Sequence, residues 1–127
     1  MSAPETAEEE RAYRELAEQR RAKSSQFSAV QHTLLTKRKV KRRSELCLAE
    51  VQQLPEETVS YKAVGRMFIA CPLPSIKQEL TSMITKAEED IAAAEPQEKY
   101  LEREIQAIDK DLEKLADEQD EKRQADK

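Results

Sequence analysis

The chain has 127 residues, of which 38% are charged, and it contains one glycine, no tryptophan and only 5 aromatic residues. This composition leaves little material for a compact core and few positions for sharp turns, which argues against a globular enzyme. The 22 basic and 26 acidic residues give a net charge of −4, so the chain as a whole lacks the basic excess of a nucleic-acid-binding protein.

The first predicted element is a helical arm over residues 7–53. Thr6 and Glu9 have the spacing of a capping box at its start, and Pro55 follows its end. A three-four spacing along this arm gives a weak seam, in which seven of twelve positions are apolar. These positions are Tyr13, Leu16, Arg20, Lys23, Phe27, Val30, Leu34, Lys37, Lys41, Ser44, Leu48 and Val51.

The centre of the chain, residues 58–72, predicts a β-hairpin. Apolar and polar residues alternate up to Val64, a continuous apolar run begins at Met67, and Gly65 lies at the turn. A lone two-stranded hairpin is marginal in water, and this one has two open edges and apolar side chains on both faces of its second strand. The sequence therefore predicts oligomerisation through six assembly residues: Tyr61, Val64, Gly65, Met67, Phe68 and Ile69.

The second helical arm is predicted over residues 75–122. Ser75 with Gln78 fits a capping box, and Pro72 and Pro74 are expected to keep the preceding chain non-helical. A four-three spacing continues for five heptads, and ten of its eleven positions are apolar, which is typical of a coiled coil. These positions are Leu80, Ile84, Ala87, Ile91, Ala94, Glu98, Leu101, Ile105, Ile108, Leu112 and Leu115.

The two arms have matching seams, which predicts a long antiparallel two-helix coiled coil. Leu16 to Val51 spans 35 residues, and Leu80 to Leu115 spans the same number. We expect Val51 to lie opposite Leu80. This register also places Ser44 opposite the small residue at position 87, and it sets basic residues against the apolar positions 108 and 112, which would then be poorly covered.

Pro96 interrupts the second arm. A proline inside a helix removes one backbone hydrogen bond, at a cost of about 3 kcal/mol. Because Pro96 lies outside the seam, we expect the helix to bend at this point; the alternative is that it breaks into two helices.

Residues 37–43 contain six basic residues in seven. We interpret this run as a solvated helix face, or as a patch that attracts acidic partner proteins. A nuclear-import signal and a nucleic-acid patch are the alternatives. A basic-zipper protein is excluded by order, because Pro55 and an apolar hairpin separate the basic run from the second seam.

The sequence offers little catalytic chemistry, so we expect no enzyme, no cofactor and no metal site. His32 is the only histidine and is expected to face solvent, and no phosphate loop or nucleophile motif occurs. Cys47 and Cys71 fit free thiols in the reducing cytoplasm. The acidic start of the chain is unlike a signal peptide, and no apolar run approaches the length of a membrane span.

The run from Tyr61 to Ile69, placed between two coiled-coil arms, resembles the central motif of the β-class prefoldin subunits. The segment from Tyr100 to Arg103 resembles the same family, and the resemblance covers essentially the full chain in order and spacing. The sequence departs from the family pattern at Pro96, where the family usually continues without proline, and in the unusually basic residues 37–43.

This resemblance implies a subunit of a hexameric, ATP-independent co-chaperone that contains two α-class chains and other β-class chains. In that family the hairpins merge into a β-barrel platform, and the coiled-coil tips hold unfolded actin and tubulin for the cytosolic chaperonin. A cytoplasmic location follows, with a possible nuclear pool. For client binding at the tips we single out Tyr13, Leu16, Ile108, Leu112 and Leu115.

A structural coiled-coil adaptor that binds folded helical partners is the alternative function. An adaptor would use the same seams and the same hairpin, but it would not bind denatured proteins promiscuously. Suppression of client aggregation therefore discriminates between the two functions.

Overall fold

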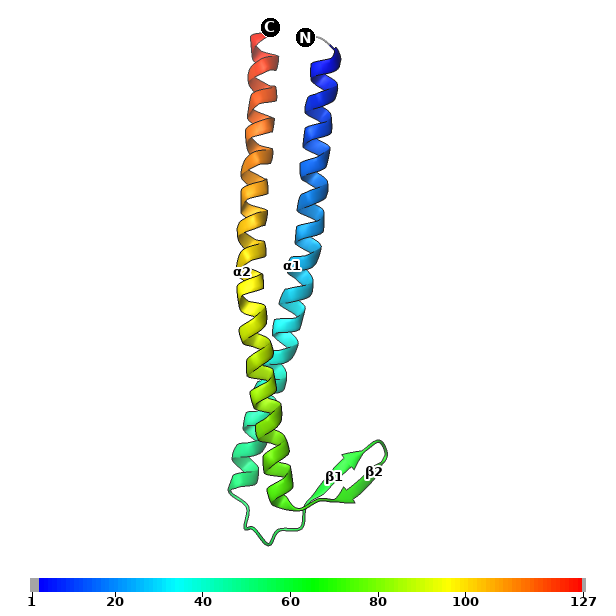
Figure 1. Ribbon diagram of the computed structural model, residues 1–127, viewed down its shortest axis with the longest axis vertical. Coiled ribbons are helices and arrows are strands. Elements are labelled where there is room, and N and C mark those ends of the chain that lie inside the picture. The colour runs from blue at the N-terminus through cyan, green and yellow to red at the C-terminus, as the bar shows by residue number, and fades with distance from the viewer. Residues whose placement is uncertain (1–2, 127) are drawn as a thin grey trace. The chain divides into compact units, whose positions relative to one another are not determined.

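The computed structural model describes residues 3–126, with side chains from residue 7 onward. Its elements are α1 (Ala3–Gln52), β1 (Tyr61–Val64), β2 (Met67–Ala70) and α2 (Leu73–Ala125), in that order (Figure 1). The predicted mainly α-helical fold with a central β-hairpin is therefore confirmed. The chain divides into two compact units, one formed by residues 1–31 with 96–127 and the other by residues 32–95.

The unit formed by residues 32–95 contains the hairpin, the end of α1 and the start of α2. Small and apolar side chains fill the space between its helices, and Leu34, Leu73 and Ala87 are at most 2% exposed. Three ion pairs between α1 and α2 flank this core. From Lys37 to Lys41 the residue number on α1 increases, while that of the partner on α2 decreases from Asp90 to Glu88, so the two helix segments are antiparallel. The pairs are Lys37 with Asp90 at 3.1 Å, Lys41 with Glu88 at 3.6 Å and Arg38 with Glu95 at 3.2 Å.

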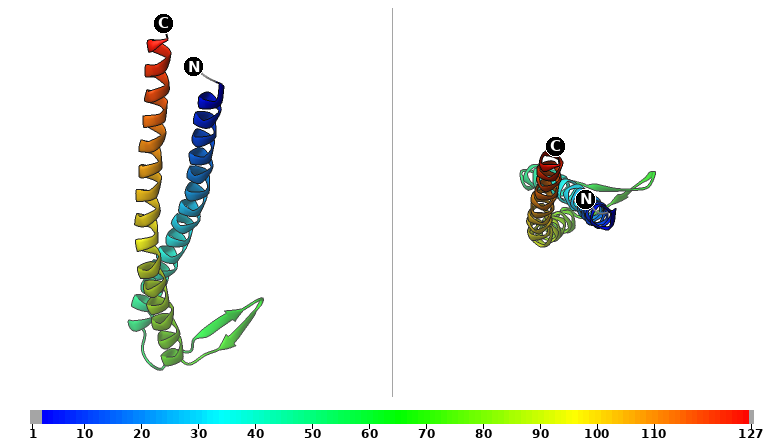
Figure 2. Two further views of the ribbon diagram at one scale, coloured as in Figure 1. Left: turned by 45° about the horizontal axis from the view of Figure 1, so that its top comes forward. Right: turned by 90° about the horizontal axis from the view of Figure 1, so that it is seen from above.

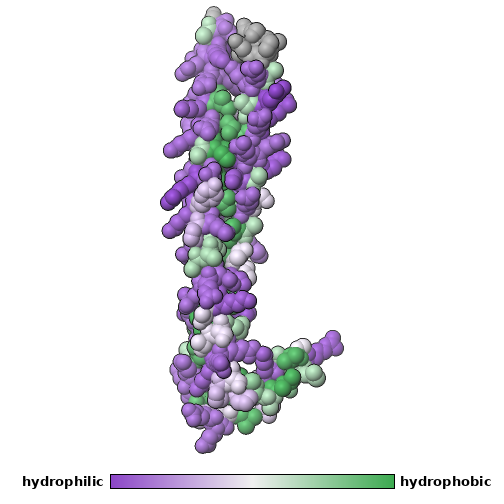
Figure 3. All heavy atoms as spheres, in the orientation of Figure 1, coloured by the Kyte–Doolittle hydropathy of each residue, from purple (hydrophilic) through white to green (hydrophobic). Residues whose placement is uncertain are grey.

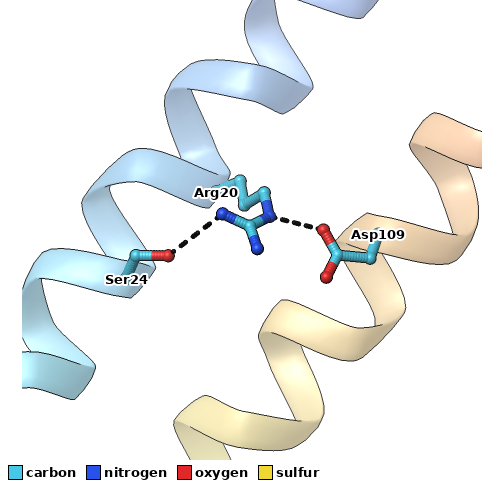
Figure 4. A network of polar contacts seen from close by, with 3 residues as sticks. All are labelled: Arg20, Ser24 and Asp109. Atoms are coloured by element: carbon cyan, nitrogen blue, oxygen red, sulfur yellow. Dashed lines mark hydrogen bonds and ion pairs between the residues drawn. The ribbon is translucent and has the colours of Figure 1, made fainter.

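The unit formed by residues 1–31 and 96–127 pairs the first half of α1 with the second half of α2. Leu101 and Ile108 are its most buried apolar residues, with 6% and 7% of their surface exposed. The Arg20 guanidinium binds Asp109 across the helices and also contacts Ser24 one turn further along α1 (Figure 4). Both hydrogen bonding and charge attraction by the Asp109 carboxylate raise the pKa of Arg20 above its usual value.

The predicted heptad seam of α2 matches the observed burial. None of its eleven positions is exposed, and even the single charged position, Glu98, is half-buried. In the weaker seam of α1, ten of twelve positions are buried or half-buried, whereas Tyr13 and Arg20 are exposed. The seams thus form the contact between the helix segments within each unit.

α2 continues through Pro96, so the alternative of a break into two helices is wrong. The proline lies outside the seam, and its missing N–H removes only one bond of a helix that has many others. The boundary between the two units falls at this residue and, on α1, after Gln31.

The ends of the helices differ from the predicted bounds of 7–53 and 75–122. α1 begins at Ala3, so position 6 already lies within the helix, and the side chain of Thr6 lies outside the described residues. α2 begins at Leu73 and ends at Ala125. The expectation that Pro74 lies before the helix is wrong, because a proline in the first turn loses no helical hydrogen bond.

The predicted capping box of Ser75 is also wrong. The Ser75 and Ile76 amides donate hydrogen bonds of 3.0 and 3.2 Å to the Pro72 carbonyl, so Pro72 is the residue that precedes the first helical turn and Ser75 lies inside that turn. A proline at this flanking position provides a carbonyl acceptor but no side-chain oxygen, which is why the sequence pattern placed the cap at the next hydroxyl residue instead.

Ser44 is 2% exposed, and its hydroxyl has no hydrogen-bond partner in the described part of the chain. A buried hydroxyl without a partner is unfavourable, and serine is a weaker helix former than alanine. We expect Ser44→Ala to raise the free energy of unfolding by about 1 kcal/mol, measured by denaturation followed by circular dichroism. Ser28→Ala, at an exposed position of the same helix, is the control for helix propensity, and an equal gain in both variants would contradict the effect of burial.

Candidate assembly and client-binding surfaces

The hairpin turns through two residues, Gly65 and Arg66, because Val64 pairs directly with Met67. Gly65 has a φ of 63°, and every non-glycine residue described has a negative φ. A positive φ at the first central position followed by a negative φ at the second is the pattern of a type II′ turn, which matches the twist of the two strands. The predicted role of Gly65 at the reversal is therefore confirmed.

Gly65 is required by its backbone conformation alone, because a side chain built there would meet nothing within 4 Å. We expect Gly65→Val to destabilise the hairpin by about 1–2 kcal/mol, since a β-branched residue strongly disfavours positive φ. Gly65→Asn should have a smaller effect, because asparagine tolerates this conformation. The measurement is the hydrogen exchange of the strand amides, and equal protection in the two variants would contradict the expectation.

The strand register assigns each apolar residue of the hairpin to a face. Paired residues of an antiparallel sheet share a face, and Tyr61 pairs with Ala70, Lys62 with Ile69, and Ala63 with Phe68. Tyr61 and Phe68 therefore lie on one face, and Val64, Met67 and Ile69 lie on the other. Both faces are apolar, as the sequence predicted.

Every residue of both strands is exposed in the isolated chain. Phe68 is 76% exposed and Met67 64%, and hydrophobic side chains are visible over the hairpin in Figure 3. Within the unit of residues 32–95, the hairpin ribbon stands away from the start of α2 in Figure 1 and in the left view of Figure 2. The six predicted assembly residues are thus brought together on a hairpin that the rest of the described chain leaves largely exposed.

The outer edges of the hairpin present unpaired backbone groups. In a two-residue hairpin the pair beside the turn exchanges hydrogen bonds and the next pair does not, so Ala63 and Phe68 direct their N–H and C=O groups outward. By the same alternation, the backbone N–H and C=O groups of Tyr61 and Ala70 point outward, and the following pair, Ser60 with Cys71, is hydrogen-bonded. The hydrogen bond of 2.9 Å from the Cys71 amide to the Ser60 carbonyl agrees with this pattern. Both edges can therefore accept further strands.

A salt bridge ties the hairpin to α2. The Lys62 ammonium lies 2.5 Å from the Glu79 carboxylate, and this hydrogen bond, with charge attraction to the same group, raises the pKa of Lys62 above its usual value. Ile76, Leu80 and Met83 of α2 line a pocket together with the start of β1. The sequence did not predict this contact, because Lys62 and Glu79 are 17 residues apart and lie in a strand and a helix, whose separate periodicities give no information on how the two elements pack.

The predicted client-binding residues lie in the unit of residues 1–31 and 96–127, toward the end at which α1 begins and α2 ends (Figure 1). Tyr13 is 44% exposed. Leu16, Leu112 and Leu115 are half-buried. Ile108 is only 7% exposed, so the expectation that it is poorly covered is wrong. The basic residue expected opposite it, Lys23, has its ammonium over the exposed Tyr100 ring, and Arg20 binds the exposed Asp109, so both cationic groups are held outside the seam.

The same unit has an exposed aromatic residue that the seam analysis missed. Tyr100 is 56% exposed, and the Lys23 ammonium lies 5.7 Å from the centre of its ring. Val30 and Leu101 line a shallow apolar groove beside it. Tyr100 lies outside the heptad positions, so the only sequence signal for it was its place in the segment 100–103, which resembles the prefoldin family.

Within residues 3–126, no group of three or more His, Cys, Asp or Glu side chains is placed to hold a metal ion. His32 is exposed, as is Cys47, and Cys71 is half-buried; neither cysteine is in a disulfide. The helices described contain no segment that is both long and apolar enough to cross a membrane.

Fold and surface together define a class of protein: a helical-hairpin subunit whose central β-hairpin is open to other strands on both edges and both faces. The prefoldin subunit family matches residues 14–119, which is most of the chain. The chain therefore belongs to the prefoldin subunit family.

Several relatives are named as subunit 1 of this family. The chain is 37% identical over 70 residues to a probable prefoldin subunit 1 of Dictyostelium discoideum, covering 55% of this chain and 61% of that protein. It is 28% identical over 92 residues to prefoldin subunit 1 of Arabidopsis thaliana, with 72% of each chain covered. The human prefoldin subunit 1 is 31% identical over 77 residues, covering 61% of this chain and 63% of the human protein.

The fold is also similar to a solved structure. The crystal structure of the prefoldin beta subunit from Thermococcus strain KS-1 superposes with a TM-score of 0.72, covering 81% of this chain and 90% of that chain at 21% identity. The resemblance to β-class subunits is therefore confirmed at the level of the fold, and the similarity to prefoldin subunit 1 is confirmed by the named relatives.

Proposed function

We propose that this chain is a non-enzymatic subunit of a hexameric, ATP-independent co-chaperone that contains two α-class chains and other β-class chains. The observation that carries the proposal is the hairpin, whose apolar residues are exposed on both faces while its backbone is open on both edges. Burying such a surface against neighbouring strands is strongly favourable, so the hairpin joins an oligomeric β-barrel through the six assembly residues.

Client capture is the second part of the proposal. Unfolded polypeptides, actin and tubulin among them, bind the helix ends through Tyr13, Leu16, Ile108, Leu112 and Leu115 and pass to the cytosolic chaperonin. Tyr13 is already exposed, whereas Ile108 becomes available only when the last turns of the helices separate. Each contact is weak, but several subunits hold one client chain at the same time, and the contacts add through effective concentration.

Mass measurement after mixing with the other subunits tests the assembly part. The expected result is a hexamer that contains this chain, and a chain that stays separate from all partners would overturn the proposal.

Truncation to residues 20–105 tests the client-binding part. In the reconstituted hexamer, this shortened chain should assemble normally but lose most of the suppression of client aggregation, because it lacks all five proposed contact residues. Unchanged suppression would refute client binding at the tips. The intact hairpin in this variant keeps the two parts of the proposal separable.

The cytoplasm is the proposed location, since an actin- and tubulin-directed chaperone works there. A nuclear pool through residues 37–43 is less favoured, because these residues belong to α1 and three of them are held in ion pairs. An aggregation assay distinguishes the alternative adaptor function from the co-chaperone function. An adaptor would assemble through the hairpin but would not suppress the aggregation of denatured actin.

A further inference from the structure

The six basic residues of the run 37–43 divide between two faces of α1. Three of them form the ion pairs with α2 described above. The other three are exposed and take part in no ion pair among the residues described. Two leucines flank them on the same helix, Leu35 with 53% and Leu46 with 52% of its surface exposed. We call these five residues the basic stripe: Leu35, Lys39, Arg42, Arg43 and Leu46.

Helical geometry places the basic stripe opposite the seam. At about 100° per residue, positions 35, 39, 42 and 46 fall within an arc of about 60°, and Arg43 lies close beside it. The seam positions Leu34, Ser44 and Leu48 fall on the other side of the helix, where they are buried or half-buried. The stripe is therefore unavailable to α2 and faces away from the core of its unit.

The stripe borders a shallow open groove. Lys39, Arg42, Arg43 and Leu46 line it together with Cys47. Its walls are largely apolar because the aliphatic stems of the basic side chains lie along the helix while their charges reach outward. A groove with apolar walls, a cationic rim and a leucine at each end of the stripe fits a ligand that is both apolar and acidic.

We propose that the basic stripe is a docking surface for an acidic amphipathic helix of a partner protein. Leu35 and Leu46 are eleven residues apart, about 16 Å along the axis, so the partner helix carries two apolar residues at this spacing. Its carboxylates lie between them, against the three cations. Charge complementarity of this kind sets orientation and the rate of encounter.

Nucleic acid fits the stripe less well. Leu35 and Leu46 have no counterpart on a phosphate backbone, whereas two apolar residues of a helix can pack against them. The three basic residues on the other face are already neutralised by Asp90, Glu88 and Glu95, so the six charges do not act as one patch. The basic stripe lies on the outer face of α1 and includes none of the residues proposed for assembly or client capture.

Fluorescence anisotropy with the full-length chain tests the proposal. The probe is a labelled helical peptide of roughly 16 residues with two leucines eleven positions apart and glutamates between them on the same face. We expect Lys39→Glu/Arg42→Glu/Arg43→Glu to weaken binding at least tenfold. Lys99→Glu/Arg103→Glu/Lys110→Glu, which reverses three exposed charges of α2 with the same change in net charge, should weaken it less than twofold.

A second pair of measurements separates the apolar contribution from the charge. Leu35→Ser/Leu46→Ser should weaken binding about tenfold, and so should a peptide with glutamine in place of every glutamate. Circular dichroism of each variant verifies that the helix content is unchanged, which is expected because all the substituted residues are exposed.

Three results would overturn the proposal. Equal losses in the two triple variants would show attraction by net charge alone. A short DNA duplex that binds more tightly than the peptide, and loses binding in the stripe variant, would identify a nucleic-acid patch. Failure of the stripe variant to assemble with the other subunits would show that this face of α1 is an interface within the oligomer.

Discussion

Phe68→Asp is expected to leave a helical subunit that no longer enters the oligomer. Phe68 is 76% exposed in the isolated chain, so an aspartate there costs the free subunit little. The cost arises on assembly, when neighbouring strands would enclose an unpaired carboxylate, and a penalty of several kcal/mol is expected for that burial. Size-exclusion chromatography and native mass measurement after mixing with the partner subunits would show the variant as free chain.

Phe68→Leu is the matched control, because it keeps an apolar side chain at the same position and should be incorporated. Far-UV circular dichroism should be the same for both variants, since neither touches a helix. Normal incorporation of the aspartate variant would refute the hairpin as the assembly interface, whatever its effect on client binding.

The second helical arm shows how much of this fold can be predicted from the local periodicity of apolar residues. A four-three spacing over eleven positions located every buried contact of α2 from Leu80 to Leu115, including the half-buried Glu98. The buried face could be predicted this well because the pattern repeats, and each of the five heptads identifies the same face of the helix. The hairpin was predicted for a different reason: a single glycine between two short β-like runs leaves few other structures.

Features that depend on side-chain partners were not predictable in this way. Ile108 was expected to be poorly covered because its register partner, Lys23, is basic, but the Lys23 ammonium lies over the Tyr100 ring, Arg20 binds Asp109, and Ile108 is only 7% exposed. The start of α2 was misplaced because a backbone carbonyl, that of Pro72, accepts the first hydrogen bonds instead of a hydroxyl. Both outcomes depend on the directions of individual groups, which periodicity does not encode.

The basic run shows the same limit at a functional surface. Its composition indicated a charged patch, but the structure divides it into three cations paired with α2 and three that face outward. Only the second set is available to a partner. Composition therefore overestimates the charge that a ligand would meet, and the leucines at 35 and 46 give the stripe a specificity that charge counting misses.

Leu34→Ala is expected to be the most destabilising single substitution in the helices of the unit formed by residues 32–95. Leu34 is 1% exposed, so its truncation to alanine leaves a cavity in the contact between α1 and α2. A loss of about 2–4 kcal/mol in the free energy of unfolding is expected. In a chain with so small a core, that loss is a large fraction of the total stability.

Leu35→Ala provides a control within the same turn of helix. It makes the same chemical change with the same effect on helix propensity, but Leu35 is 53% exposed, so its loss should stay within about 0.5 kcal/mol. Urea denaturation followed by circular dichroism, at two protein concentrations to detect association through the hairpin, measures both variants. Equal losses at positions 34 and 35 would contradict the assignment of the seam, because only burial against α2 distinguishes the two leucines.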